Sequence, residues 1–133
     1  MIAFLDRWRP AVLSMLRIVV ALLFVEHGLM KLFGFPAPQP GTENGLPPML
    51  LVAALIETIA GGLVAVGLFT RAAAFLCSGM IAVGYFSAHA PQGFWPALNG
   101  GEPAVLFAFT FLYFVFAGGG AWSLDALRGS RAR

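Results

Sequence analysis

The sequence predicts an all-α fold: a polytopic membrane protein in which four transmembrane helices form a bundle. Composition is the first observation, since 59% of the residues are hydrophobic, 11% are charged and the mean hydropathy is +0.85. A chain of 133 residues cannot bury that much apolar surface in a soluble core, so lipid must cover much of it. The second observation is four apolar stretches, each close to the roughly 20 residues that cross about 30 Å of hydrocarbon.

Each of the four stretches is expected to be a helix, and together they make one transmembrane domain over residues 1–133. None alternates apolar and polar residues as a membrane β-strand does, so each must satisfy its own backbone groups as a helix. The first stretch follows Arg7 and Arg9, as in a signal peptide, but it is too long and lacks a small-residue cleavage motif. We therefore expect it to be retained. The predicted spans are residues 11–33, 48–69, 72–90 and 103–120.

The basic residues predict the orientation of the bundle. Seven of the eight lie at or toward one side: before the first span, early within it, in the tight link at residues 67–71, or in the tail. By the positive-inside rule, we expect both termini and that link to be cytoplasmic. Lys31 is the exception. The seven residues on the cytoplasmic side are Arg7, Arg9, Arg17, Arg71, Arg128, Arg131 and Arg133.

Two charged residues lie deep inside the predicted spans. At about 1.5 Å per residue, Arg17 lies roughly 10 Å and Glu57 roughly 18 Å above the cytoplasmic helix ends, a difference that an arginine side chain can bridge. Either charge alone would be strongly destabilising in hydrocarbon, so we predict that Arg17 and Glu57 form a pair. The pair either locks the first two helices together or helps to hold a ligand or move a proton.

A second polar group is expected near the outer face. Glu26 and His27 lie roughly 24 Å up the first helix, His89 ends the third span and Glu102 opens the fourth. Tyr85 shares a helix face with His89. Histidine titrates near neutral pH and burial can raise a glutamate toward it, so these residue types suit ligand binding or proton handling.

Two of these residues also have simpler interpretations. Glu102 complements the dipole of the helix that it opens. Glu26 is about 180° around the helix from Arg17, so the first helix either contacts partners on two sides or takes part in a homo-oligomer.

Other classes of site find little support in the sequence. Adjacent Glu26 and His27 point about 100° apart, and no spacing puts two ligands on one helix face, so no metal site is predicted. The lone Cys77 allows neither an internal disulfide nor Cys-x-x-Cys dithiol chemistry. No nucleotide-binding loop or nucleophile elbow occurs, so no catalytic residue is assigned. The basic residues sit at helix ends and form no surface for nucleic acid.

Taken in order, a set of motifs resembles the DoxX family of four-helix bacterial inner-membrane proteins. The resemblance runs from Arg17 to Asp125. The chain ends this pattern with three glycines where many members have Gly-Pro-Gly, which matters little for the fold. The motifs are Arg17 with Gly28 and Lys31, Glu57 with Gly61 and Gly62, the turn at residues 67–71, His89 before an aromatic loop, Gly101 with Glu102, and the closing residues 118–125.

The resemblance implies a function linked to quinone redox chemistry, because the family takes its name from a small membrane subunit associated with thiosulfate:quinone oxidoreduction. The chain has no residues to ligate a haem or iron–sulfur cluster, so quinone or a partner's cofactor must carry any electrons. Two hypotheses follow. The first is a quinone-associated subunit of a membrane oxidoreductase complex, with a polar pocket shaped by Arg17, Glu57, His89 and Glu102. The second is a non-enzymatic membrane protein that stabilises a partner or carries a small hydrophobic molecule.

Overall fold

The computed structural model describes residues 2–131, so Arg133 of the basic tail lies outside them. Within these residues every regular element is a helix and no strand occurs, which confirms the all-α prediction. The elements are α1 (Ile2–Asp6), α2 (Arg9–Phe33), α3 (Pro48–Leu55), η1 (Ile56–Ala60), α4 (Gly61–Val66), α5 (Thr70–Gly84), η2 (Tyr85–His89), η3 (Ala90–Gln92), α6 (Pro96–Asn99), α7 (Glu102–Ala117) and α8 (Leu124–Arg131).

Three helical segments are long and apolar enough to cross a membrane. They are α2, the continuous segment Pro48–Val66 made of α3, η1 and α4, and the segment Thr70–Gln92 made of α5, η2 and η3. The fourth, α7, is apolar but has only 16 residues. It ends three residues before the predicted position because Gly118 leaves the helical conformation with a φ of 79°. The chain is therefore a helical membrane protein.

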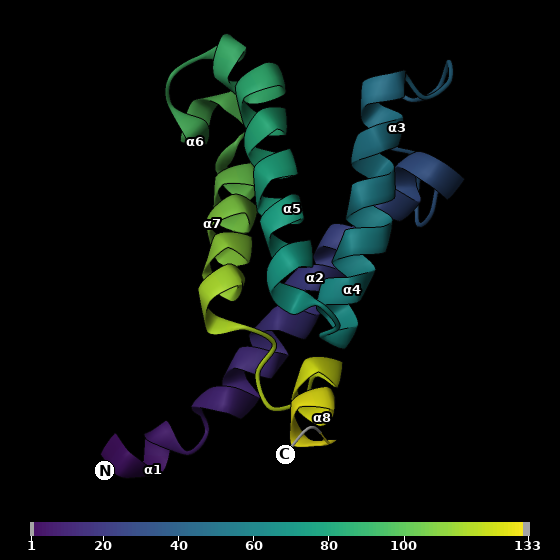
Figure 1. The fold of residues 1–133 in the computed structure, drawn as a ribbon. Coiled ribbons are helices and arrows are strands. Elements are labelled where there is room, and N and C mark those ends of the chain that lie inside the picture. The colour runs from purple at the N-terminus through teal and green to yellow at the C-terminus, as the bar shows by residue number, and fades with distance from the viewer. Residues whose placement is uncertain (1, 132–133) are drawn as a thin grey trace.

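The helices pack as two pairs around a shared core. α5 and α7 run side by side, and α2 packs against the continuous segment of α3, η1 and α4 opposite them (Figure 1). Phe24 of α2, Val64 of α4 and Phe111 of α7 meet in this core, each no more than 3% exposed. Both described ends of the chain lie at the same end of the molecule (Figure 1).

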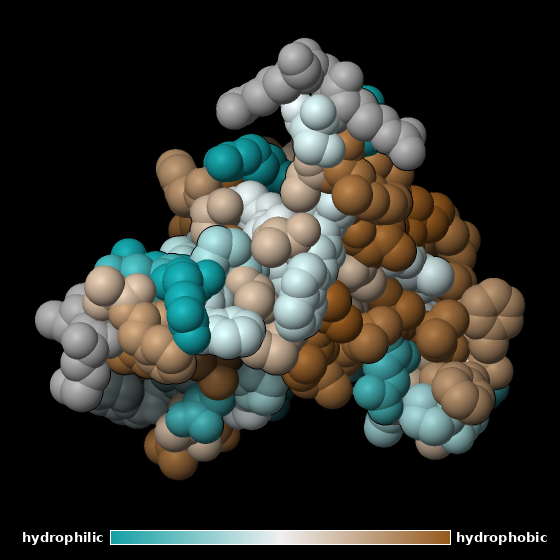
Figure 2. All heavy atoms as spheres, turned by 90° about the horizontal axis from the view of Figure 1, so that it is seen from below, coloured by the Kyte–Doolittle hydropathy of each residue, from teal (hydrophilic) through white to brown (hydrophobic). Residues whose placement is uncertain are grey.

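Much of the outer surface is apolar, as contact with lipid requires. Large side chains such as Phe86 of η2 and Phe116 of α7 project outward and are more than 70% exposed. Figure 2 looks onto the end that carries the termini, where polar residues gather beside a broad hydrophobic area. Because no soluble monomer exposes so many large apolar side chains, these surfaces are the ones that the bilayer covers.

Gly28 sets the distance between α2 and the helix opposite. A Cβ atom at this position would collide with the hydroxyl oxygen of Thr58 and approach the Ala54 carbonyl oxygen to 3.0 Å. Small residues allow membrane helices to approach this closely. One turn farther along α2 lies Lys31, so the close contact at Gly28 brings the Lys31 side chain within reach of η1.

A polar cavity between the helices as candidate functional site

A buried ion pair joins the C-terminal end of α2 to η1. The Lys31 Nζ atom lies 2.7 Å from Oε1 and 2.6 Å from Oε2 of Glu57, so one ammonium donates to both carboxylate oxygens. The two side chains are 6% and 8% exposed. Such a pair offsets the cost of placing either charge in a low-dielectric environment. The ion pair between Arg9 and Asp6, by contrast, is exposed.

The predicted pair of Arg17 with Glu57 is not formed. Arg17 is fully buried and its guanidinium is used on backbone carbonyls: Nε donates to Gly119 (2.8 Å), and the two terminal nitrogens reach other carbonyls. Those acceptors are the carbonyl oxygens of Val64, Ala65 and Trp122. The physical reason is that a helix end leaves carbonyls without intrahelical partners, and α4 ends at Gly67 within reach of Arg17.

The sequence did hold a signal for the observed pair. Ser14, Arg17, Ala21, Phe24 and Gly28 form the buried face of α2, at alternating steps of three and four residues. Lys31 is the next residue in that series, so it shares the face of Arg17 and points into protein. The prediction from depth alone chose Arg17 as the partner of Glu57, because it did not consider main-chain carbonyls as hydrogen-bond acceptors.

The Lys31–Glu57 pair lines a cavity of about 480 Å³ among the helices. It lies in the half of the molecule away from the termini and takes residues from α2, α3, η1, α5, η2 and α7. Phe24, Met80 and Phe107 supply part of its apolar wall. Cavities of this size hold small organic ligands, with a few polar groups fixing the orientation. The polar side chains that line it are His27, Lys31, Gln39, Glu57, Tyr85 and His89.

Both histidines are held in one tautomer by backbone carbonyls. Nδ1 of His27 lies 2.8 Å from the Leu23 carbonyl oxygen, and Nδ1 of His89 lies 3.0 Å from that of Asn99. A carbonyl oxygen only accepts hydrogen bonds, so each Nδ1 carries a proton and donates it. In the neutral ring the other nitrogen, Nε2, is then unprotonated and free to accept.

The short helix α6 fixes Tyr85 and His89. Asn99, its last residue, donates from Nδ2 to the Tyr85 hydroxyl oxygen at 3.3 Å and to the Gly93 carbonyl at 2.8 Å. Its Oδ1 accepts from the Gly101 amide at 2.8 Å. Gly101 packs directly against the Tyr85 ring, where a Cβ atom would approach Cε2 to 2.5 Å. Asn99 is thus a supporting residue that the sequence analysis did not single out.

Two π-helical turns carry three of the six polar residues of the cavity. Glu57 belongs to η1, and Tyr85 and His89 belong to η2. A π-turn inserts one extra residue and rotates the side chains that follow, and such turns are frequent at functional sites. Both turns lie on the cavity. Sequence periodicity assumes 3.6 residues per turn and could not reveal them.

Two predicted residues of the outer group lie outside this cavity. Glu102 is exposed in the first turn of α7, as its dipole-complementing interpretation requires. Glu26 is half-buried on α2, and no hydrogen bond or ion pair joins it to the described residues. Over the described part of the chain, no group of three or more His, Cys, Asp or Glu side chains is arranged to hold a metal ion.

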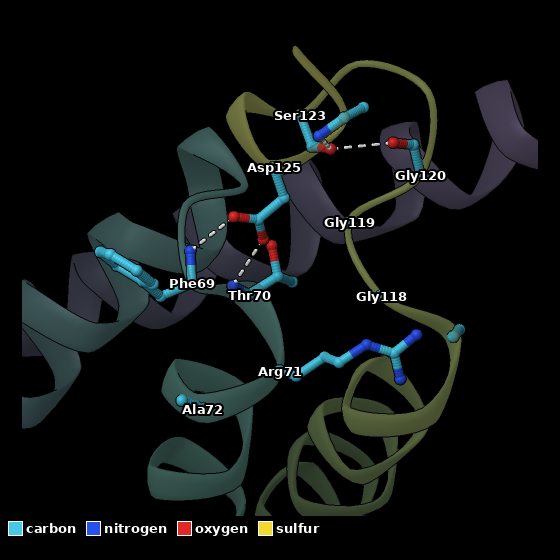
Figure 3. A pocket seen from close by; sticks show the side chains of 11 residues that line it. Phe69, Thr70, Arg71, Ala72, Gly118, Gly119, Gly120, Ser123 and Asp125 are labelled. Atoms are coloured by element: carbon cyan, nitrogen blue, oxygen red, sulfur yellow. Dashed lines mark hydrogen bonds between the residues drawn. The ribbon is translucent and has the colours of Figure 1, made fainter. Parts of the chain in front are cut away.

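A second polar cluster closes the end of the molecule that carries the termini. Asp125 accepts hydrogen bonds from the amides of Phe69 and Thr70, each at 2.9 Å, and so caps the start of α5 (Figure 3). Partial burial raises the pKa of Asp125, but these hydrogen bonds and nearby Arg128 outweigh it, and the net pKa is lowered. Arg71 donates to two carbonyls at the end of α7. The cluster uses its polar groups on the chain itself, which indicates a structural role.

Comparison with known proteins places the chain among membrane proteins without an assigned activity. A family model described as DoxX matches residues 12–90. An uncharacterized protein of Haemophilus influenzae is 48% identical over 91% of this chain and 93% of its own length. The uncharacterized membrane protein Rv3486 of Mycobacterium tuberculosis is 29% identical over 92% of this chain and 84% of its own. No solved structure matches the chain.

Proposed function

Since this chain belongs to the DoxX family, we propose that it is a quinone-associated membrane subunit whose ligand binds in the cavity beside Lys31 and Glu57. The main support for this proposal is the cavity. It combines a volume suited to a small organic molecule with an apolar wall and a buried charged pair, the combination that an aromatic head on a hydrophobic tail requires.

The residues divide into three roles in this proposal. Lys31 and Glu57 supply the electrostatic centre, and Lys31 keeps one N–H beyond the two that it gives to Glu57. Tyr85, His27 and His89 provide hydrogen bonds and a route for protons. Phe24 and Phe107 enclose the ring, while the tail extends between helices toward lipid. Arg17, Glu26 and Glu102 take no direct part.

A redox partner completes the function. Quinone would be the electron carrier, and a membrane or peripheral oxidoreductase would supply or accept the electrons. The protein is then a subunit that binds and presents quinone. If it binds a hydrophobic molecule without any redox partner, it belongs instead to the non-enzymatic carriers.

Binding of a short-chain quinone tests the proposal. A ligand that prefers the folded protein raises its stability by about 2.7 kcal/mol at 100 times Kd, so decylubiquinone should raise the unfolding midpoint of the purified protein. The change Tyr85→Phe should weaken this shift, because the Tyr85 hydroxyl lines the cavity and can donate to a quinone carbonyl. Glu102→Gln is the matched control and should leave the shift intact. No shift in the wild-type protein would refute the proposal.

We further propose that the single domain spans the bacterial inner membrane four times with both termini in the cytoplasm. The location of both described ends at one end of the molecule agrees with an even number of spans (Figure 1). The positive-inside rule supplies the direction. In intact cells, an impermeant thiol reagent should modify a cysteine at Thr42 and fail to modify one at Ser130. The buried Cys77 should give little background. The opposite labelling pattern would invert the topology.

A further inference from the structure

The cavity holds three hydrogen-bond acceptors that have no partner among the described residues. His27 and His89 each donate the Nδ1 proton to a backbone carbonyl. In the neutral rings, the remaining nitrogen, Nε2, can therefore only accept a hydrogen bond in the cavity. Gln39, which also lines the cavity, has a buried side-chain oxygen without any hydrogen-bond partner. These three groups come from α2, from η2 and from the link between α2 and α3.

Donors remain as well, and one of them is the Gln39 amide nitrogen, which donates to no described residue. Lys31 uses two of its three N–H groups on Glu57, and the Tyr85 hydroxyl receives a hydrogen bond from Asn99, which leaves its own proton available. An acceptor-only head such as a quinone can therefore pair with Lys31 and Tyr85, but it leaves the histidine nitrogens and the Gln39 oxygen unpaired. A hydroxyl group both donates and accepts, so it can serve either kind of partner.

We propose that this cavity selects a ligand whose polar head carries hydroxyl groups, so that a hydroquinone or alkylphenol binds more tightly than the corresponding quinone. The inference rests on the proposed function for the place of the site, but it concerns the chemical class of the head. The hydroxyl protons are donated to Nε2 of His27 and of His89. His27 is exposed and His89 half-buried on the chain, so within the bilayer these acceptors face hydrocarbon, where an unpaired acceptor is costly. The preference should therefore be about tenfold or more in Kd.

Four probes with the same decyl tail test the inference in the purified protein: the quinone, its hydroquinone under anaerobic conditions, the hydroquinone dimethyl ether and 4-decylphenol. The ether has the shape of the hydroquinone without its donors, and the phenol has a donor but is not reduced or oxidised under these conditions. We expect the hydroquinone and the phenol to bind at least about tenfold more tightly than the quinone and the ether.

A pair of neighbouring variants shows whether the histidine is responsible. His27→Phe keeps a ring against Phe107, which His27 contacts edge-on, but removes the acceptor. It should reduce the preference for the hydroxylated probes by several-fold. Glu26→Gln, one residue away and outside the cavity, should keep the preference unchanged. His89→Phe provides a second removal of an acceptor should either variant lose its fold.

The outcomes separate this inference from the proposed function. Equal affinity for hydroquinone, ether and quinone would overturn the donor requirement and leave a quinone site standing. Binding of 4-decylphenol without binding of the quinone would support the donor requirement and refute the quinone assignment. Tighter binding of the quinone than of the hydroquinone, or binding of no probe, would overturn the inference, and the latter would refute the site as well.

Discussion

Removing one partner of the Lys31–Glu57 pair should destabilise the protein far more than removing both. In Lys31→Met the Glu57 carboxylate is left 8% exposed with no cation, and in Glu57→Met the Lys31 ammonium is left 6% exposed with no anion. Breaking one side of a buried ion pair costs about 3–5 kcal/mol. Replacing both partners with apolar side chains of similar size is often neutral or stabilising.

The expected coupling follows from these values. Each single variant should lose about 3–5 kcal/mol of unfolding free energy, whereas the double variant should stay within about 1 kcal/mol of the wild type. The double variant would then be at least about 5 kcal/mol more stable than the sum of the single losses predicts. The short distances of 2.7 and 2.6 Å to both carboxylate oxygens favour a value at the upper end.

Unfolding in mixed detergent micelles, followed by circular dichroism, measures the four free energies of this cycle. A control cycle combines Lys31→Met with Glu26→Gln, since Glu26 is on the same helix but makes no contact with Lys31 among the hydrogen bonds and ion pairs of the described residues. The losses of unfolding free energy caused by Lys31→Met and by Glu26→Gln should be additive. If the Lys31 and Glu57 losses also add within about 0.5 kcal/mol, the two charges do not stabilise one another and the reasoning is wrong.

Three further predictions use other contacts. Arg17→Lys should lower the unfolding free energy by about 2–3 kcal/mol in the same micelle assay, because one ammonium cannot reach the carbonyls that the guanidinium joins. Gly28→Ala should cost about 1–3 kcal/mol by overpacking, whereas Gly79→Ala, with open space around it, should be neutral or stabilising by up to about 1 kcal/mol. The lowered pKa of Asp125 adds stability that is complete above the pKa of its unfolded state, about 3.9, and is lost as the pH falls through the folded value. Asp125→Asn should remove this acid-dependent loss from a plot of unfolding midpoint against pH.

The parts of the fold that follow from apolar composition were predictable. Long apolar runs predicted the helices, whereas the spacing along α2 that marks the buried face of Arg17 and Gly28 was present in the sequence but was not used for the prediction. Of the candidate residues named from the sequence, His27, Glu57, Tyr85 and His89 line one cavity in the structure. The partner of Glu57 could not be predicted from depth, because Arg17 is bound by backbone carbonyls, and these acceptors have no signature in the sequence.

The buried cations on α2 divide the molecule into two ends with different tasks. The Arg17 guanidinium donates hydrogen bonds to main-chain carbonyls of α4 and of the segment after α7. These bonds hold the two segments together at the end of the molecule that carries the termini. Lys31, four turns along the same face, leaves one N–H unused beside a cavity. A charge that is fully paired with backbone holds a structure, whereas a charge pair beside an open volume can also serve a ligand. The closed end therefore supplies a rigid base, and the chemistry of this protein belongs to the end where Lys31 and Glu57 meet.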